Sequence, residues 1–538
     1  MTTSIRIALA QLNLCVGDLE GNLQKHIHAA NEARDKYAAN LIIFPELSLT
    51  GYPPKDLLLR PAFIASAQRI LEQFISQTTG IDALVGHPYL DEKGLQNSCS
   101  LIRDRVCLGR YAKQCLPNYS VFDEYRYFVP GNHSYVAIIN HLPIGFIICE
   151  DVWQTTPISQ AIAAGAKLIV VTNASPFETD KHELRLAVLA KYAKQYRIPI
   201  IYVNHIGGQD EIIFDGGSMV INEEGNLCQF AGFYQERLLV VNLDVASTQA
   251  IEKNIIVPHQ LERIYQGLVL STHDYVEKNN FQRVLVGVSG GIDSALTLAI
   301  AVDALGKERV NAVMMPSRYS AAISLEDGIS VAKKLGVKFD IISIEQVHQS
   351  FLETLMPHFA GKKPDVTEEN IQSRCRGVLL MALSNKYHSL VLTTGNRSEL
   401  AVGYCTIYGD MAGGFAVLKD IPKTFIYKLV NYRNQLSLVI PQRTIERPPT
   451  AELAPNQKDE DCLPPYSILD EILYQYLNRS QSIDEIVAQG FKRDMVTKIV
   501  NLIRINEYKR QQAAVGPRIN YKSFGDDWRY PITNGFKG

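Results

Sequence analysis

The sequence lacks three features that would each point to a particular class of protein: a long apolar run, a strong net charge and closely paired cysteines. No stretch reaches the roughly 18 apolar residues that a membrane helix needs, so we expect no membrane partner. The 54 basic and 56 acidic residues leave a formal net charge of −2, which gives no electrostatic reason to expect nucleic acid. The nine cysteines show neither a CxxC pair nor metal-ligand spacing, which favours a reducing, cytoplasmic setting. The first residues, MTTSIRIALAQLNL, indicate a strand rather than a signal peptide.

A glycine-rich turn in the second half of the chain lacks the lysine that marks a common type of phosphate-binding loop. Residues 289–294 read SGGIDS, between the apolar run 283–288 and a helical pattern at 295–305. Backbone N–H groups and a helix N-terminus would then surround one small volume, which suits an anion. The lysine of the GxxxxGK[ST] loop is missing, so the turn is not of that phosphoryl-transfer type. It resembles the pyrophosphate-binding loop of enzymes that split ATP into AMP and pyrophosphate. The alternative is an ordinary strand–helix turn with an Asp or Ser cap.

A chain of 538 residues exceeds the size at which one core keeps growing, so we expect at least two domains. We place them at residues 1–250 and 258–538, joined by the polar stretch 246–254 and followed by an amphipathic helix near 259–278. In the first domain, helix-period spacing predicts helices at 22–39, 61–78 and 181–196. Short β-rich runs predict strands at 5–14, 40–44, 83–86, 98–103, 134–139, 143–149, 168–172, 198–204 and 238–245.

The second domain alternates predicted strands, at 284–288, 310–315, 338–344 and 390–394, with helices. This alternation favours a doubly wound parallel sheet, in which ligands bind beyond the carboxyl ends of the strands. The SGGIDS turn lies at such an end. The segment 445–466 is rich in proline and charge, and we expect a long mobile loop there, of the kind that often acts as a lid.

Three residues of the first domain are chemically complementary and end or follow predicted strands: Glu46, Lys113 and Cys149. A thiol is a useful nucleophile only as the thiolate. A carboxylate can take its proton, and a lysine can stabilise both the thiolate and a developing oxyanion. Spacing alone does not unite them: each could be a surface charge or, for the cysteine, a core residue.

The strings around these residues are more specific. FPELSLTGY at 44–52, YAKQCLPNY at 111–119 and ICEDVW at 148–153 resemble the three motifs of nitrilase-superfamily amidases. The resemblance implies an α-β-β-α sandwich with the catalytic triad Glu46, Lys113 and Cys149. The strings FDEYRYF at 122–128, NASPF at 173–177 and GGQDE at 207–211 match the glutaminase branch. That branch implies glutamine contacts from Tyr119, Ser175 and Lys181, with Arg185 a weaker candidate and Glu124 a support for the triad.

With both halves considered, the chain resembles the glutamine-dependent NAD⁺ synthetases. The supporting strings are NIQSRCR at 370–376, TGNRSE at 394–399, GYCTIYGD at 403–410 and NEYKR at 506–510. Lys419-Asp420 and Pro422-Lys423 also recur in the family. Arg397 departs from it, because the family commonly has Lys there, and an Arg keeps the charge but not its point geometry.

The resemblance implies the ligands of the second domain, a Rossmann-like sheet of the adenine nucleotide α-hydrolase type. Deamido-NAD⁺ is assigned to Asn370, Glu399 and Lys509, with Asp410 and Lys419 as additions. Mg²⁺ is assigned to Asp293 and Glu399, since a hard cation bridging phosphates needs oxygen ligands. ATP is assigned to Gly287, Val288, Ser289, Gly290, Gly291, Ile292, Asp293, Ser294 and Thr394.

The expected reaction is ATP-dependent amidation of deamido-NAD⁺ through an adenylate, with ammonia released from L-glutamine by the first domain. Self-association into a homo-oligomer is implied by resemblance only. Three alternatives stay open at this point. They are another amidotransferase with the same ATP loop, making GMP or asparagine, a stand-alone amidase with a degenerate second domain, and a nucleotide-binding regulatory or scaffold protein that binds ATP without turnover.

Overall fold

The computed structural model describes residues 4–244, 255–455 and 457–536, and its chain divides into two compact units, Met1–His259 and Gln260–Gly538. The amphipathic helix expected near 259–278 is α5 (Gln260–Lys278), at the start of the second unit. The polar linker expected at 246–254 lies outside the described residues, and the predicted domain limits stay predictions.

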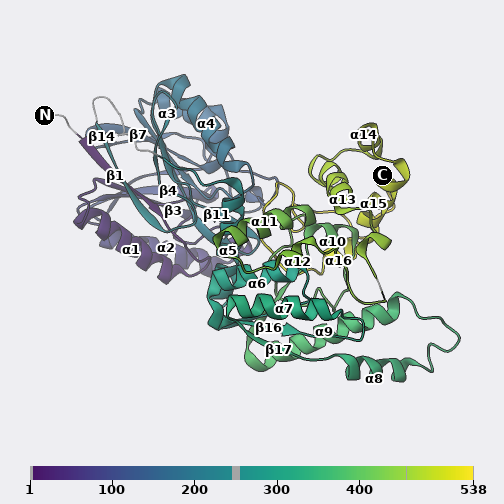
Figure 1. The fold of residues 1–538 in the computed structure, drawn as a ribbon. Coiled ribbons are helices and arrows are strands. Elements are labelled where there is room, and N and C mark those ends of the chain that lie inside the picture. Colours follow the sequence, from purple (N-terminus) through teal and green to yellow (C-terminus); the bar gives the residue numbers. More distant parts are fainter. Residues whose placement is uncertain (1–3, 245–254, 456, 537–538) are drawn as a thin grey trace. The chain divides into compact units, whose positions relative to one another are not determined.

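The first unit is built on two six-stranded sheets (Figure 1). One has the order β14-β1-β2-β3-β4-β5 and the other β13-β12-β9-β8-β7-β6. The bounds of the first are β1 (Ser4–Gln11), β2 (Leu41–Ile43), β3 (Asp82–Asp91), β4 (Gly94–Arg103), β5 (Val106–Ala112) and β14 (Arg237–Asp244). Those of the second are β6 (Tyr135–Ile139), β7 (Leu142–Ile148), β8 (Leu168–Asn173), β9 (Ile200–Asn204), β12 (Met219–Ile221) and β13 (Leu227–Phe230).

Alternation along the strands explains why the sheets stack. In β1, Ile5, Ile7 and Leu9 join one buried cluster with β7 and β8, whereas Ala8 and Ala10 join another with the helices α1 (Leu19–Asp35) and α2 (Pro61–Gln77). Since successive side chains of a strand point to opposite faces, one face meets the other sheet and one meets helices. The helices α3 (Thr155–Ala163) and α4 (Lys181–Tyr196) pack on β7 and β12. The predicted α-β-β-α sandwich is confirmed.

The second unit contains a five-stranded, all-parallel sheet of order β17-β16-β15-β18-β19. The strands are β15 (Arg283–Gly287), β16 (Val310–Met314), β17 (Lys338–Ile341), β18 (Ser389–Thr393) and β19 (Phe415–Ala416). The chain moves outward from β15 to β17 and then returns to β18 on the other side. The strand order therefore reverses between β15 and β18, where ligands bind in doubly wound folds. The predicted doubly wound sheet is confirmed.

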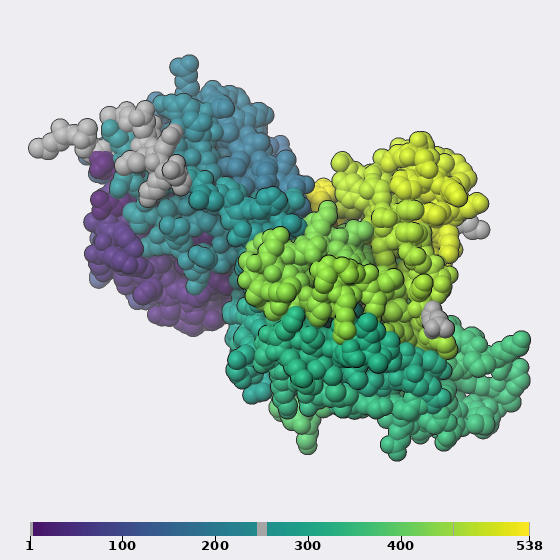
Figure 2. All heavy atoms as spheres, in the orientation of Figure 1, coloured from purple at the N-terminus to yellow at the C-terminus, as the bar shows by residue number. Residues whose placement is uncertain are grey.

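Helices cover this sheet and form a further group near the C-terminus. The helices α6 (Ile292–Leu305), α7 (Ala322–Leu335) and α9 (Val366–Tyr387) pack directly on the sheet. The others nearby are α8 (Glu345–Leu355), α10 (Arg397–Val402), α11 (Lys423–Leu436) and α12 (Gln442–Glu446). The C-terminal helices α13 (Tyr466–Leu473), α14 (Ile483–Ala488) and α15 (Arg493–Ile505) share a core of their own with α10 and lie in the yellow lobe of Figure 2. The short helix α16 (Glu507–Arg510) follows α15 and packs on α10.

Several predicted elements differ from the structure. The first strand ends at Gln11 rather than at residue 14, and β3 continues to Asp91 rather than ending at residue 86. The segment 445–466 contains the end of α12 and one short 3₁₀ turn, Asp459–Asp461, among its described residues. Sequence patterns missed α3, β5, β12, β13, β19 and the pair β10 (Ile206–Gln209) and β11 (Ile212–Asp215).

Candidate active sites

The first site gathers where strands of both sheets of the first unit end. Glu46 follows β2, Lys113 follows β5 and Cys149 follows β7. The Lys113 Nζ donates to Glu46 Oε1 at 2.7 Å and to Glu124 Oε1 at 2.8 Å. The Lys113 and Glu46 side chains are fully buried. The structure thus joins two of the three predicted triad members directly and adds Glu124 as a second carboxylate on the same ammonium.

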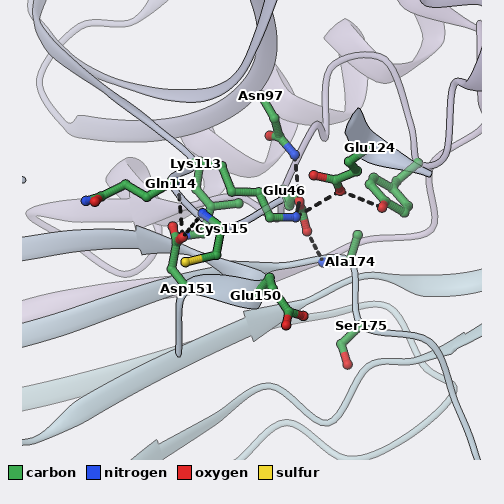
Figure 3. Close-up of polar contacts among 12 residues, drawn as sticks. Glu46, Asn97, Lys113, Gln114, Cys115, Glu124, Glu150, Asp151, Ala174 and Ser175 are labelled. Atoms are coloured by element: carbon green, nitrogen blue, oxygen red, sulfur yellow. Dashed lines mark hydrogen bonds and ion pairs between the residues drawn. The ribbon is translucent and has the colours of Figure 1, made fainter. Parts of the chain in front are cut away.

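The Glu46 carboxylate is held by further donors, as Figure 3 shows. Asn97 Nδ2 donates to Oε1 at 2.7 Å, and the backbone N–H of Ala174 donates to Oε2 at 2.9 Å. A carboxylate with a donor on each oxygen keeps one orientation. Sequence reasoning missed Asn97 and Ala174, because an amide and a backbone N–H carry no chemical signature of their own.

The protonation states in this cluster follow from burial and charge. Burial lowers the pKa of Lys113, but the carboxylates of Glu124 and Glu46 outweigh burial and raise it well above its ordinary value. Burial raises the pKa of Glu124 to about 7, while Lys113 opposes this and Glu46 adds to it. The Tyr52 hydroxyl donates to Glu124 Oε1 at 2.8 Å. Lys113 is therefore charged, and Glu124 titrates close to neutral pH.

Cys149 directly follows β7 as the first residue of a 3₁₀ helix, Cys149–Trp153, and has a positive φ of 44°. A non-glycine residue in this region stores strain and is enriched at functional sites. Burial is the main reason, and the charge of Glu46 a further one, that the pKa of the thiol is raised well above its ordinary value. The resting sulfur is thus a thiol, and it needs a base to become a nucleophile.

The residues expected to contact glutamine lie in different settings. The Tyr119 hydroxyl donates to Glu150 Oε2 at 2.8 Å, and Lys181 Nζ lies 4.9 Å from the centre of the Trp153 ring. Ser175 is buried in the loop that follows β8. The structure therefore places Tyr119 and Lys181 against neighbours of Cys149 in the 3₁₀ turn.

Arg185, the weaker glutamine candidate, lies behind Ser175. Its guanidinium donates to Asp215 at 2.8 Å, to Ser175 Oγ at 3.1 Å and to the carbonyls of Ser175 and Pro176. The side chain is fully buried, so these contacts use its charge and its donors. Arg185 supports the Ser175 loop and is not placed to contact a substrate.

The second site is a cavity of about 290 Å³ at the point where the strand order of the parallel sheet reverses. The segment 287–294 runs from the end of β15 into α6 and forms one wall. Thr394 and Glu399 line it beyond β18, and Lys423 and Arg376 add two cationic side chains to the lining. The predicted ATP residues that line the cavity are Gly287, Val288, Ser289, Gly291, Ile292, Asp293, Ser294 and Thr394.

Gly290 is not in that lining; it has a φ of 82° and packs against the backbone carbonyl of Ser324. Arg376 was not selected from the sequence, although it ends the NIQSRCR string. Its Nε donates to the carbonyl of Met315 at 3.0 Å, and burial lowers its pKa. The proline-rich loop also reaches the cavity, where residues 447–453 line it, and Glu452 accepts from the N–H of Ala321 at 3.1 Å.

The two residues expected to bind Mg²⁺ both accept a hydrogen bond from the same lysine. Lys423 Nζ donates to Asp293 Oδ2 and, at 3.2 Å, to Glu399 Oε1, while Asn396 Nδ2 donates to Asp293 Oδ1 at 2.9 Å. Burial raises the pKa of Glu399 to about 7, against the opposing effect of Lys423. Two carboxylates converging on one cation is the donor set that Mg²⁺ uses together with phosphate oxygens and water. The residues therefore fit the ion, although the described residues contain no cluster of three or more ligating side chains.

Asn370 and Lys509 are not among the lining residues of the cavity. Asn370 Oδ1 accepts from Thr406 Oγ1 at 2.8 Å, and Lys509 Nζ donates to the carbonyls of Gly403 at 2.7 Å and Cys405 at 2.8 Å. Both side chains thus hold the 403–410 segment, whose Asp410 does line the cavity.

Fold and site together define the class: an amidase-type unit joined to an ATP-cleaving, nucleotide-binding unit is the composition of a glutamine-dependent amide ligase. Comparison with known families supports both halves, since residues 6–253 match the carbon-nitrogen hydrolase model and residues 264–513 match the NAD synthase model. The chain belongs to the glutamine-dependent NAD⁺ synthetase family, because it is 48% identical to that enzyme of Acinetobacter baylyi over 99% of both chains. It is also 42% identical to the Thermotoga maritima enzyme over 99% of both chains.

Comparison with solved structures supports the same family. The glutamine-dependent NAD⁺ synthetase of Acinetobacter baumannii, determined in complex with ADP, superposes with a TM-score of 0.81 at 45% identity and 99% coverage of both chains. The enzyme of Cytophaga hutchinsonii, 22% identical with a TM-score of 0.83, shows the same fold. No described helix of this chain combines the length and apolar character needed to span a bilayer.

Proposed function

We propose that this protein converts deamido-NAD⁺ to NAD⁺, with ATP and L-glutamine as co-substrates and AMP, pyrophosphate and glutamate as products. One observation carries the proposal: the full-length identity to glutamine-dependent NAD⁺ synthetases coincides with a buried Glu–Lys cluster beside Cys149 and with a pyrophosphate-type loop over a cavity. The same identity disfavours GMP or asparagine synthesis, a stand-alone amidase and a scaffold.

Glutamine hydrolysis begins at Cys149. Glu46 takes the thiol proton as the sulfur attacks the side-chain amide, and it returns that proton to the departing ammonia. Lys113 and the backbone N–H of Glu150 stabilise the oxyanion, and water then releases glutamate from the thioester. Tyr119, Ser175 and Lys181 contact the glutamine substrate.

The second unit activates the nicotinate carboxylate. Attack of this carboxylate on the α-phosphorus of ATP forms an acyl adenylate and releases pyrophosphate, which the N–H groups of residues 287–294 stabilise together with Thr394. Ammonia then displaces AMP. Deamido-NAD⁺ binding is assigned to Asn370, Glu399 and Lys509, of which Asn370 and Lys509 also hold the 403–410 segment.

Asp293 and Glu399 would hold Mg²⁺, which neutralises charge on the phosphates when it is bound. Lys423 balances the same carboxylates and is kept charged by them, because Asp293 and Glu399 raise its pKa even though burial lowers it. A small cavity of about 20 Å³, lined by Glu399 and Asp410, is large enough for one molecule the size of water or ammonia.

The test compares NAD⁺ formation by the unmodified protein and by Cys149→Ala, with glutamine and, separately, with ammonium salt. We expect Cys149→Ala to lose glutamine-driven synthesis and keep ammonia-driven synthesis. Absence of NAD⁺ from either nitrogen source with the unmodified protein would refute the proposal. A homo-oligomer and a cytoplasmic location belong to the same proposal. Light scattering tests the first, and none of the nine cysteines forms a disulfide in the described residues.

A further inference from the structure

Asp151 is a buried carboxylate beside the first site that no step of the proposed reaction uses. It accepts four hydrogen bonds. Its Oδ2 accepts from the N–H of Ile148 at 3.1 Å and from the Tyr111 hydroxyl at 2.7 Å. Its Oδ1 accepts from the N–H of Gln114 at 3.1 Å and from the N–H of Cys115 at 2.8 Å. Figure 3 shows the side chain directed to these last two residues.

The two oxygens hold two different segments of the chain. Ile148 directly precedes Cys149, so Oδ2 fixes the start of the turn that carries the nucleophile. Gln114 directly follows Lys113, so Oδ1 fixes the end of the segment that carries the ammonium. Because Cys149 has a positive φ, its turn depends on such neighbouring contacts to keep its conformation.

Burial makes this charge costly. The Asp151 side chain is fully buried, and burial raises the pKa of its carboxyl to about 6, although the hydrogen bonds from Tyr111, Cys115 and Ile148 oppose the shift. An asparagine of the same shape would offer one acceptor oxygen and an NH₂ donor. It would satisfy one segment and set its NH₂ against the donors of the other, so the site requires a carboxylate with two acceptor oxygens.

We propose that Asp151 is a positioning residue for glutamine hydrolysis: its carboxylate joins the Cys149 turn to the Lys113 segment and so sets where the sulfur lies relative to the ammonium. The inference rests on the proposed function, in which Cys149 is the nucleophile and Lys113 stabilises the oxyanion. None of the four hydrogen bonds of Asp151 goes to Tyr119, Ser175 or Lys181, so we expect it to act on the rate of the chemical step and not on glutamine affinity.

The experiment measures glutamate release by Asp151→Asn in the full-length protein with deamido-NAD⁺ and Mg-ATP present. A misplacement of about 1 Å costs roughly 10²-fold in rate, so we expect kcat to fall at least ~10-fold while KM for glutamine stays within about threefold. Ammonia-driven NAD⁺ formation should be unchanged. Asp82→Asn is the matched control, because Asp82 is another buried carboxylate of the first unit. It is the first residue of β3 and pairs with Arg103. Asp82→Asn should retain kcat.

Tyr111→Phe keeps the proposal testable if Asp151→Asn does not fold. It removes one of the four donors, and we expect a smaller loss in kcat with KM again unchanged. The rate of Cys149 alkylation by iodoacetamide should fall in the same order, Asp151→Asn below Tyr111→Phe below the unmodified protein. A rise in KM with kcat retained, an equal loss in Asp82→Asn, or unchanged kcat in both Asp151→Asn and Tyr111→Phe would overturn the inference. If Cys149→Ala still hydrolyses glutamine, the proposed function itself fails.

Discussion

Gly290 is the residue of the pyrophosphate loop where an added methyl group should weaken ATP binding most. Its φ of 82° lies in the region that L side chains rarely adopt, and a Cβ built on it would overlap the carbonyl oxygen of Ser324. That oxygen belongs to the backbone at the start of α7, so no side-chain rotation can relieve the clash. The change Gly290→Ala must therefore displace either the loop or the helix.

The magnitude follows from these two costs. A side chain in a left-handed conformation costs about 1–2 kcal/mol, and inserting a methyl group into a packed site costs about 1–3 kcal/mol. Together they oppose the ATP-binding conformation by about 2–5 kcal/mol. Since each ~1.4 kcal/mol is a factor of ten, affinity for ATP should fall by roughly 30-fold to several thousand-fold.

Gly291→Ala provides the comparison within the same loop. Gly291 has a φ of −85°, and a Cβ at this position would meet only the Ser289 hydroxyl, at 3.3 Å, which can rotate away. ATP affinity measured by calorimetry, and ammonia-driven NAD⁺ formation, should fall far less for Gly291→Ala than for Gly290→Ala. Equal losses in the two variants, or ATP binding within threefold of the unmodified protein for Gly290→Ala, would refute this reasoning.

Three other predictions concern charge. Because burial, with Glu46 adding to it and Lys113 opposing it, raises the pKa of Glu124 to about 7, the ionised form is lost as pH falls through 7, and kcat/KM for glutamine should decline from pH 8 to 6. Glu124→Gln should be slower throughout and lack that inflection; a profile parallel to the unmodified protein would contradict the assignment. Lys423→Met leaves the partly buried carboxylates of Asp293 and Glu399 without their ammonium, so we expect a stability loss of about 1–3 kcal/mol in denaturant titrations and loss of synthesis from both nitrogen sources. Chelation of Mg²⁺ by EDTA should stop NAD⁺ formation, and Asp293→Asn should raise the Mg²⁺ needed for half-maximal rate, an effect absent if the ion binds elsewhere.

Hydrophobic periodicity predicted the long, regular elements well and the short ones poorly. The helices α2 and α4 begin at Pro61 and Lys181 as expected, because their apolar spacing is continuous over four turns. The strand β10, with sequence IGGQ, has no alternation to detect and is defined only by its pairing with β11. Likewise β5 interrupts its apolar residues with Gly109 and Arg110, which removes the period of two.

Some residues of the candidate sites could be predicted from sequence motifs, and others could be found only in the structure. Glu46, Lys113 and Cys149 could be selected because their motifs are specific, and the structure adds that Lys113 lies between two carboxylates. Asn97 and Asp151 could not be selected, since their importance lies in which backbone and carboxylate groups the fold brings to them. Apart from the Ile148 contact of Asp151, these contacts join residues tens of positions apart and leave no local pattern in the sequence.

The pairing of one ammonium with two carboxylates has a consequence for what leaves the first site. Glutamine enters with an uncharged side chain, whereas glutamate leaves with an anionic one. When Glu46 and Glu124 are both ionised, the cluster carries one negative charge more than Lys113 neutralises, and it lies buried where charges are weakly screened. The reaction thus converts an uncharged side chain into an anionic one that this cluster repels. This repulsion favours release of glutamate without any conformational change, and we expect glutamate to be a weak inhibitor.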